Sequence, residues 1–238
     1  MKYFVSDVHL GLKRGNPAER EARFVSWLRA IPHESGNSLY LLGDIWDFWY
    51  EYHDVVPKRG ARVIAALIDL MDSGVEVNFV PGNHDIWCYG FFAELGMKIL
   101  PQGYVLEDGA HRILVAHGDL LGGASRSYRF MQSVFHNRVC QRLFSALHPR
   151  IAFKIGCDWS KSSRKAHAPY QWKGLEEPLC KWSLAQEPGI DTFIFGHFHT
   201  SVDQALPEGK RLIVLDSWVD CDDCPCVISD GADLKVCR

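Results

Sequence analysis

Five short clusters of metal-competent residues constrain this chain most, because each follows a predicted strand. They are Asp-Val-His at 7–9, Gly-Asp at 43–44, Gly-Asn-His-Asp at 82–85, His-Gly-Asp at 117–119 and Gly-His-Phe-His at 196–199. In an open α/β sheet, the carboxyl ends of the strands face the crevice where ligands bind. We therefore expect the five clusters to meet at one site.

The donor types in these clusters indicate a transition metal. Side chains alternate along a strand, so Asp7 and His9 share one side of an extended segment, as do His197 and His199. Carboxylate, imidazole and one amide oxygen suit Mn²⁺, Fe or Zn²⁺, whereas Ca²⁺ and Mg²⁺ favour all-oxygen shells. A single Asp-x-His is common by chance, and the 82–85 cluster alone could be a turn. Five clusters in one order favour a metal site.

The rest of the pattern predicts a layered α/β domain. The expected strands are short and apolar on both faces, as in the buried strands of a layered sheet. They cover residues 3–6, 38–42, 76–80, 112–116, 192–195, 212–215 and 226–229. Helices are expected at 17–30 and 59–73, and Gly74 ends the second. Without repeats or a linker, residues 1–238 are predicted to form one domain.

The segment 126–165 departs from this pattern. It holds nine Lys or Arg and one acid, so it carries about +8 while the rest of the chain lies near −11. Its apolar residues recur at i, i+3 and i+4, which predicts an amphipathic helix with a basic face. They are Phe130, Met131, Val134, Phe135, Val139, Leu143, Phe144 and Leu147. Because the segment is too long for an ordinary connection, we expect a helical cap inserted at about 122–185.

Composition excludes several classes of protein. A net charge of −3 argues against a nucleic-acid binder. The N-terminus enters a strand-like run without a signal-peptide layout, and no apolar run approaches the ~20 residues of a spanning helix. We therefore expect a cytoplasmic protein with reduced core thiols. Cys221, Cys224 and Cys226 could hold zinc, but the usual second ligand pair is missing and their role stays open.

The ordered clusters from Asp7 to His199 resemble those of the calcineurin-like metallophosphoesterase family. The resemblance implies a four-layer α/β/β/α sandwich with two divalent metal ions. It implies that one ion is held by Asp7, His9, Asp44 and His199, and the other by Asp44, Asn83, His117 and His197. It also implies that His84 stabilises the transition state or acts as the leaving-group acid, and that Asp85 orients His84. Two such ions can activate a water and polarise a phosphoryl oxygen for in-line displacement.

A narrower resemblance rests on residues 4–11 (Phe-Val-Ser-Asp-Val-His-Leu-Gly) and 41–49 (Leu-Leu-Gly-Asp-Ile-Trp-Asp-Phe-Trp). Together with the basic insertion after 117–119, they are similar to the UDP-2,3-diacylglucosamine diphosphatases of lipid A biosynthesis. This resemblance implies a lipid-linked UDP-sugar substrate, hydrolysed to UMP and 2,3-diacylglucosamine 1-phosphate, with manganese as the usual metal and Fe or Zn as alternatives. The chain departs from that group at His84, where its best-known members carry Arg.

The cap has the qualities that such a substrate requires. Its cations suit a diphosphate, and its apolar stripe suits acyl chains and peripheral contact with the inner face of the cytoplasmic membrane. The diphosphate-binding candidates are Arg126, Arg129, Arg164 and Lys165, although a solvated face is the simpler explanation for any one of them. Asp47, Phe48 and Trp49 are expected either to face the substrate or to pack beneath the metal loop.

Two other functions stay open from the sequence. One is a metallophosphoesterase for a soluble nucleotide or another small phosphodiester, which would give no reason for an apolar stripe. The other is a non-catalytic binding module of the same fold, which the filled ligand positions disfavour. Acyl-chain length and oligomeric state cannot be read from the sequence.

Overall fold

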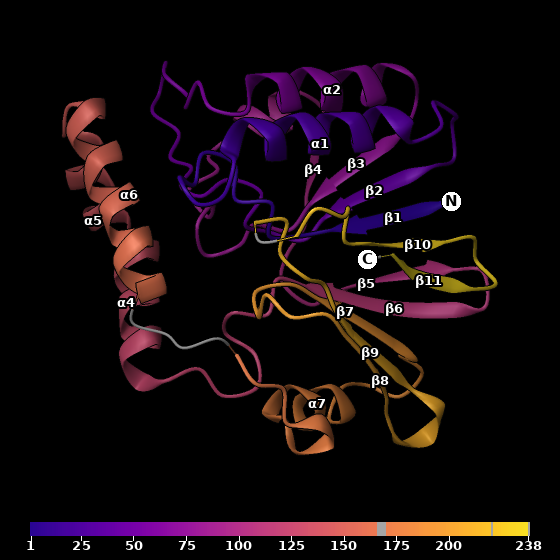
Figure 1. Cartoon of the computed structure of the whole chain (residues 1–238). Helices are drawn as coiled ribbons and strands as arrows, with labels where there is room; N and C mark the ends of the chain where they lie inside the picture. The colour runs from indigo at the N-terminus through magenta and orange to yellow at the C-terminus, as the bar shows by residue number, and fades with distance from the viewer. Residues whose placement is uncertain (166–169, 220, 238) are drawn as a thin grey trace.

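The computed structural model describes residues 1–165, 170–219 and 221–237, without the side chains of 162–165. Two sheets lie face to face, and α4 to α6 stand to one side of them (Figure 1). The first sheet has the order β11-β10-β1-β2-β3-β4. Its strands are β1 (Lys2–Val5), β2 (Ser38–Leu41), β3 (Glu76–Phe79), β4 (Lys98–Ile99), β10 (Cys226–Ser229) and β11 (Leu234–Cys237). The second sheet has the order β5-β6-β7-β9-β8. Its strands are β5 (Tyr104–Asp108), β6 (His111–Ala116), β7 (Thr192–Phe195), β8 (Val202–Ala205) and β9 (Arg211–Val214).

Two helices cover the outer face of the first sheet, α1 (Pro17–Ala30) and α2 (Ala61–Asp72) (Figure 1). Asn16 caps α1 by accepting a hydrogen bond from the Glu19 amide, and Pro17 suits the first helical position. Along β2, Leu39 and Leu41 pack toward these helices while Tyr40 packs toward the second sheet. The two-residue alternation therefore buries both faces of the strand.

The second sheet repeats this arrangement on the opposite side. In β6, Ile113 packs between the two sheets, whereas Leu114 packs outward against Leu179 and Cys180. Those two residues lie on α7 (Pro178–Leu184), which follows the short 3-10 helix η1 (Gly174–Glu176). A second 3-10 helix, η2 (Pro207–Gly209), joins β8 to β9. The expected four-layer α/β/β/α sandwich is confirmed.

All seven predicted strands are present, and the strands that the pattern missed are β4, β5, β8 and β11. Each of these four lies at an edge of its sheet. An edge strand has one hydrogen-bonded neighbour and is only partly covered, so it lacks the continuous apolar run of a central strand. Its residues consequently resemble those of a loop.

The segment 126–165 forms three helices, so the prediction of a single amphipathic helix is wrong. They are α4 (Arg126–His136), α5 (Arg138–Ser145) and α6 (Pro149–Lys165). Asn137 ends α4 in an extended conformation, and its side chain caps α5 by accepting hydrogen bonds from two amides. Pro149 then starts α6. A short helix, α3 (Phe91–Glu94), precedes β4. Among the described helices, none has the length and apolarity to cross a membrane.

Candidate metal centre

The ends of β1, β2, β3, β6 and β7 bring the seven predicted metal donors into one region of the molecule. Six non-glycine residues in the described chain have positive φ, and five of them are among these donors. They are Asp7 (54°), His9 (50°), Asp44 (54°), His197 (72°) and His199 (49°). Such a conformation costs about 1–3 kcal/mol per residue and persists where the surroundings impose it, typically at functional sites.

One group of donors surrounds Asp7. Its Oδ1 lies 3.1 Å from Nε2 of His199 and 3.6 Å from Nε2 of His9. The two Nε2 atoms of His9 and His199 lie 3.0 Å apart. Oδ2 of Asp44 lies 3.9 Å from Nε2 of His9. These four residues form the first predicted ligand set.

A second group surrounds His117, which is fully buried. Its Nε2 lies 3.5 Å from Oδ2 of Asp44 and 3.2 Å from Oδ1 of Asn83. Its Nδ1 donates to the carbonyl of Leu42 at 2.9 Å, which leaves Nε2 as the atom able to ligate a metal. The ring of His197 lies 5.2 Å from that of His117 between centroids. Asp44 borders both groups, as the bridging role requires.

The donors fit divalent cations. Oδ1 of Asp7 is buried and has no hydrogen-bond partner of good geometry, although two imidazole nitrogens face it within 3.6 Å. Ligand atoms of Asp7, His9 and His199 lie within 4.8 Å of one another, and so do those of Asp7, Asp44 and His117. A cation in each group would satisfy oxygen and nitrogen atoms that now face each other directly. Imidazole and carboxylate ligands are compatible with Mn, Fe and Zn, so the donors do not decide the metal.

Electrostatics couple these side chains to one another. Burial raises the pKa of Asp7, but the imidazoles of His199 and His9 outweigh this effect and hold the pKa well below its usual range. Burial likewise opposes ionisation of Asp44, and the charge of His117 overcomes it and lowers the pKa. Burial, reinforced by the charge of His117, lowers the pKa of His197 to about 4. Asp7 and Asp44 are thus ionised and His197 is neutral at pH 7, as metal ligation requires. Burial lowers the pKa of His117, but the Asp44 carboxylate outweighs it and raises that pKa, so a metal binding at His117 would have to displace its proton.

His84 lies beside the metal donors. Its backbone amide donates to Oδ1 of Asp44 at 2.9 Å, and its Nδ1 donates to the carbonyl of Asp47 at 2.9 Å. Its Nε2 lies 3.8 Å from Oδ2 of Asp44. The ring also lies against Trp159 of α6, with centroids 5.3 Å apart. The imidazole is therefore fixed in orientation at the boundary between the metal donors and the cap.

The expectation that Asp85 orients the His84 imidazole is corrected by these contacts. The carboxylate of Asp85 accepts hydrogen bonds from the amides of Gly82, Asp44, Ile45 and Trp46, at 2.7 to 3.2 Å. Burial, together with the neighbouring Asp44 carboxylate, raises the pKa of Asp85 to about 7. Asp85 thus ties the loop after β3 to the loop after β2, and the Asp47 carbonyl is what holds His84.

Other positioning contacts were missed by sequence reasoning. Asp119 accepts hydrogen bonds from the Tyr128 hydroxyl and the Gln132 amide at 3.1 Å each, which joins α4 to the end of β6. Oδ1 of Asp47 accepts a hydrogen bond from the Ser160 hydroxyl of α6 at 2.8 Å. Asp119 belongs to the cluster at 117–119 and Asp47 to the motif at 41–49, but nothing in their spacing indicates partners on the cap.

The other residues that the sequence analysis singled out differ in their burial. Phe48 and Trp49 are both buried, but Trp49 packs in the core with Phe92, whereas Phe48 packs against Phe153 of the cap. Arg126 and Arg129 are exposed on α4. The side chains of Arg164 and Lys165 lie outside the described part of the chain. All eight cysteines lie within it as free thiols.

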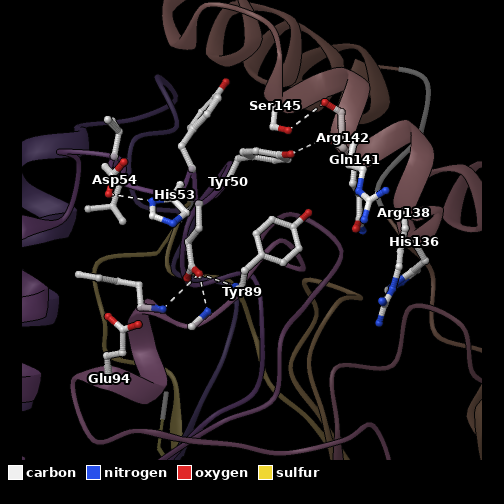
Figure 2. Close-up of a pocket in the computed structure, with 16 residues that line it drawn as sticks. Tyr50, His53, Asp54, Tyr89, Glu94, His136, Arg138, Gln141, Arg142 and Ser145 are labelled. Atoms are coloured by element: carbon white, nitrogen blue, oxygen red, sulfur yellow. Dashed lines mark hydrogen bonds and ion pairs between the residues drawn. The ribbon is translucent and has the colours of Figure 1, made fainter.

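A cavity of about 910 Å³ lies between part of the cap and the sandwich. Figure 2 shows its lining residues, with Tyr50 and Tyr89 on the side of the sandwich and Arg138, Gln141 and Arg142 on the side of the cap. The Tyr50 hydroxyl donates to the Gln141 carbonyl at 2.8 Å across this junction. Phe144 and Phe153 of the cap also pack against Tyr50 and Phe48, so hydrogen bonds and aromatic contacts both join the cap to the sandwich.

Comparisons with known proteins agree with the geometry. Residues 3–201 match the calcineurin-like phosphoesterase family. The chain is 34% identical to the UDP-2,3-diacylglucosamine hydrolase of Porphyromonas gingivalis, covering 91% of this chain and 90% of that protein. It is 32% identical to the protein of that name from Xanthomonas axonopodis pv. citri, covering 98% and 97%. For the protein of that name from Proteus mirabilis the identity is 35%, covering 71% and 68%.

Proposed function

Since this chain belongs to the calcineurin-like phosphoesterase family, we propose that it hydrolyses the diphosphate of UDP-2,3-diacylglucosamine, releasing UMP and 2,3-diacylglucosamine 1-phosphate. One observation carries the choice of substrate: the relative from Porphyromonas gingivalis bears that activity in its name and aligns with 91% of this chain. The relatives from Xanthomonas and Proteus, with the same name, support it.

In this proposal, two divalent cations are bound by the two donor groups, with Asp44 between them. The first would be held by Asp7, His9, Asp44 and His199, and the second by Asp44, Asn83, His117 and His197. When bound, such a pair neutralises phosphoryl charge and lowers the pKa of water. We propose manganese because it is the usual metal of the UDP-2,3-diacylglucosamine diphosphatases that the sequence resembles, and reconstitution would separate it from iron and zinc, which the donors also suit.

His84 would act on the phosphoryl group or on the leaving oxygen. Because Nδ1 donates to the Asp47 carbonyl, Nε2 would be the atom that acts toward the substrate. A donor at that position stabilises the negative charge that develops in the transition state. Asp85 would act as a positioning residue, since its four backbone hydrogen bonds hold the loops that carry Asp44 and His84.

The cap would bind the lipid part of the substrate. Three of its apolar side chains are largely exposed: Phe130 (71%), Val139 (63%) and Leu143 (68%). Exposed apolar residues beside cations suit acyl chains and an anionic membrane surface, where each nearby basic residue contributes about 1 kcal/mol. We propose peripheral contact with the cytoplasmic face of the membrane. The proposed diphosphate-binding residues stay Arg126, Arg129, Arg164 and Lys165.

Product analysis tests this function. The metal-loaded enzyme is incubated with UDP-2,3-diacylglucosamine and, separately, with bis-p-nitrophenyl phosphate, and the products are identified by mass spectrometry. We expect UMP and the diacylated sugar phosphate from the first substrate, at a higher kcat/KM than for the second. Turnover of the small phosphodiester without turnover of the lipid would overturn the proposal in favour of a soluble substrate.

A further inference from the structure

The loop after β2, which carries Asp44, is packed on two sides. Trp46 and Trp49 are buried in the core that the first sheet forms with α1 and α2. Phe48 and Tyr50 instead pack in a separate cluster with aromatic side chains of the cap. One side of the loop is therefore held by the sandwich and the other by the cap.

Helix α6 lies against this loop through a face of small residues. Ala152, Gly156 and Ser160 are buried at four-residue intervals, so they share one side of the helix. A β-carbon built at Gly156 would lie 2.3 Å from Cζ of Phe48. A larger residue at position 156 would therefore push the helix away from the loop.

Asp47 connects α6 with His84 and with the loop after β1. Its Oδ1 accepts a hydrogen bond from the Ser160 hydroxyl at 2.8 Å, and both side chains are buried. Its carbonyl accepts a hydrogen bond from Nδ1 of His84 at 2.9 Å. Its amide donates to the carbonyl of Leu10 at 3.1 Å, directly after the predicted ligand His9. A shift of Asp47 would therefore move the group that holds the His84 imidazole.

The bond between Ser160 and Asp47 fixes the position of Asp47. Burying a hydroxyl or a carboxyl group without a partner costs free energy, so these two groups are held together once α6 covers the loop. Trp159, the neighbour of Ser160 on α6, lies against the His84 ring with centroids 5.3 Å apart. The same turn of α6 thus contacts His84 directly and also reaches it through Asp47.

We propose that Ser160 is a positioning residue for His84, so that the packing of α6 on the loop completes the site that acts on the phosphoryl group. A displacement of about 1 Å can lower a rate about 10²-fold, and the bond from Ser160 opposes such a displacement of the Asp47 carbonyl. The inference rests on the proposed role of His84 in phosphoester hydrolysis. It adds a residue of the cap to the machinery that acts on every substrate.

Kinetics on a small phosphodiester test this role without the lipid. Ser160→Ala is compared with wild type and with Ser133→Ala, which removes a hydroxyl hydrogen bond within α4. With bis-p-nitrophenyl phosphate, we expect Ser160→Ala to lower kcat about tenfold, with KM within about twofold of wild type and an unchanged metal content. Ser133→Ala should match wild type. An unchanged kcat in Ser160→Ala, or an equal fall in Ser133→Ala, would overturn the proposal.

A double-mutant cycle separates the positioning of His84 from a general disruption of the site. If Ser160 acts through His84, its removal has little left to affect once the imidazole is gone. We expect Ser160→Ala to lower kcat by less than about twofold in the His84→Ala enzyme, against about tenfold in wild type. A tenfold fall in both backgrounds would refute the positioning role and assign Ser160 to the stability of the site.

Gly156→Ala tests the same contact from the backbone of the helix. The added methyl group would meet Phe48 and displace α6, although alanine favours the helix itself. We expect kcat on bis-p-nitrophenyl phosphate to fall at least about tenfold, and hydrogen exchange to rise in residues 45–51 but not in β1. A wild-type kcat with an unchanged loop would contradict the proposal.

The proposed function is judged separately from this inference. Failure to hydrolyse UDP-2,3-diacylglucosamine would remove the lipid substrate and leave the results on the small phosphodiester intact. Full activity of His84→Ala on both substrates would instead remove the role of His84, and the positioning role of Ser160 with it.

Discussion

The metal centre and the cap are built in opposite ways. The donors of the metal centre come from five strand ends and are mostly buried. Contacts with the backbone hold them in place: the Leu42 carbonyl accepts a hydrogen bond from His117, and the Asp85 carboxylate accepts one from the amide of Asp44. The cap consists of α4 to α6, which stand beside the sandwich (Figure 1) and expose large apolar side chains such as Phe130 and Leu143.

In our proposal, this difference places the chemistry in the sandwich and lipid recognition on the cap. A rigid set of donors has to be placed within tenths of an ångström, which buried strand ends achieve. A lipid-binding surface instead has to be apolar and reachable, which an exposed helical insertion achieves. Substitutions at the metal centre should therefore affect every substrate, whereas substitutions on the exposed cap should affect the lipid substrate alone.

The largest effect is expected for Asp44→Ala. Asp44 faces both donor groups, so its loss should remove most of the bound metal and lower the activity on every substrate by at least about 10⁴-fold. Metal content by mass spectrometry and activity on both substrates check this expectation, and circular dichroism should show a retained fold.

Asp44→Asn is the matched control for backbone strain. The φ of 54° at this position is tolerated by Asn but strains Ala, so an equal metal loss in both variants assigns the effect to the carboxylate. A fully active Asp44→Ala enzyme would contradict the bridging role.

His84→Ala should have the next largest effect. We expect kcat to fall by roughly 10²–10⁴-fold on both substrates, the usual size of an acid or oxyanion contribution. The metal content should stay near that of wild type, because the imidazole is held by the Asp47 carbonyl rather than placed among the ligands. Loss of metal in this variant would make His84 a ligand and refute its assigned role.

Leu143→Asp tests the cap alone. Leu143 is 68% exposed, so an aspartate there should not disturb folding. Loss of one buried apolar contact with an acyl chain, about 1.5 kcal/mol, should lower kcat/KM for the diacylated substrate about tenfold. Activity on bis-p-nitrophenyl phosphate should stay unchanged.

Two further variants calibrate this result. Ser133→Asp places the same charge on exposed α4 and should have little effect on either substrate. Phe135→Asp should lower both activities, because Phe135 packs against Trp87 and Trp159 beside His84. An equal loss of both activities in Leu143→Asp, or no loss, would remove the acyl-binding role of that surface.

The smallest effect is expected for Asn137→Ala. Its side chain caps α5 through the amides of Val139 and Cys140, so its loss should destabilise the cap by about 1 kcal/mol. Hydrogen exchange should rise in α5 and leave β1 and β2 unchanged. Equal increases in the sandwich would mean that the cap and the sandwich unfold together, against the separation described above.

The sequence predicted the sandwich and its donors because both depend on local signals. Buried strands such as β7 are continuous apolar runs, and a donor such as His197 directly follows one. The edge strands were missed because partial burial removes that signal. The break at Asn137 was missed because apolar spacing continues across it, although Asn is a common helix cap.

Partnerships between distant residues could not be predicted in the same way. The Asp85 carboxylate is adjacent to His84 in the sequence, yet it binds amides about forty residues away in the loop after β2. The bond between Ser160 and Asp47 crosses from the cap to the sandwich. Such contacts depend on how the layers and the cap are assembled, and that information is not local.

The metal count tests the central claim most directly. Wild-type protein is stripped with a chelator, reconstituted with increasing Mn²⁺, and assayed with bis-p-nitrophenyl phosphate while bound metal is measured by mass spectrometry. We predict that activity is absent after stripping and reaches its plateau at two ions per chain. A plateau at one ion per chain, or full activity in the stripped protein, would contradict a two-metal centre at the strand ends.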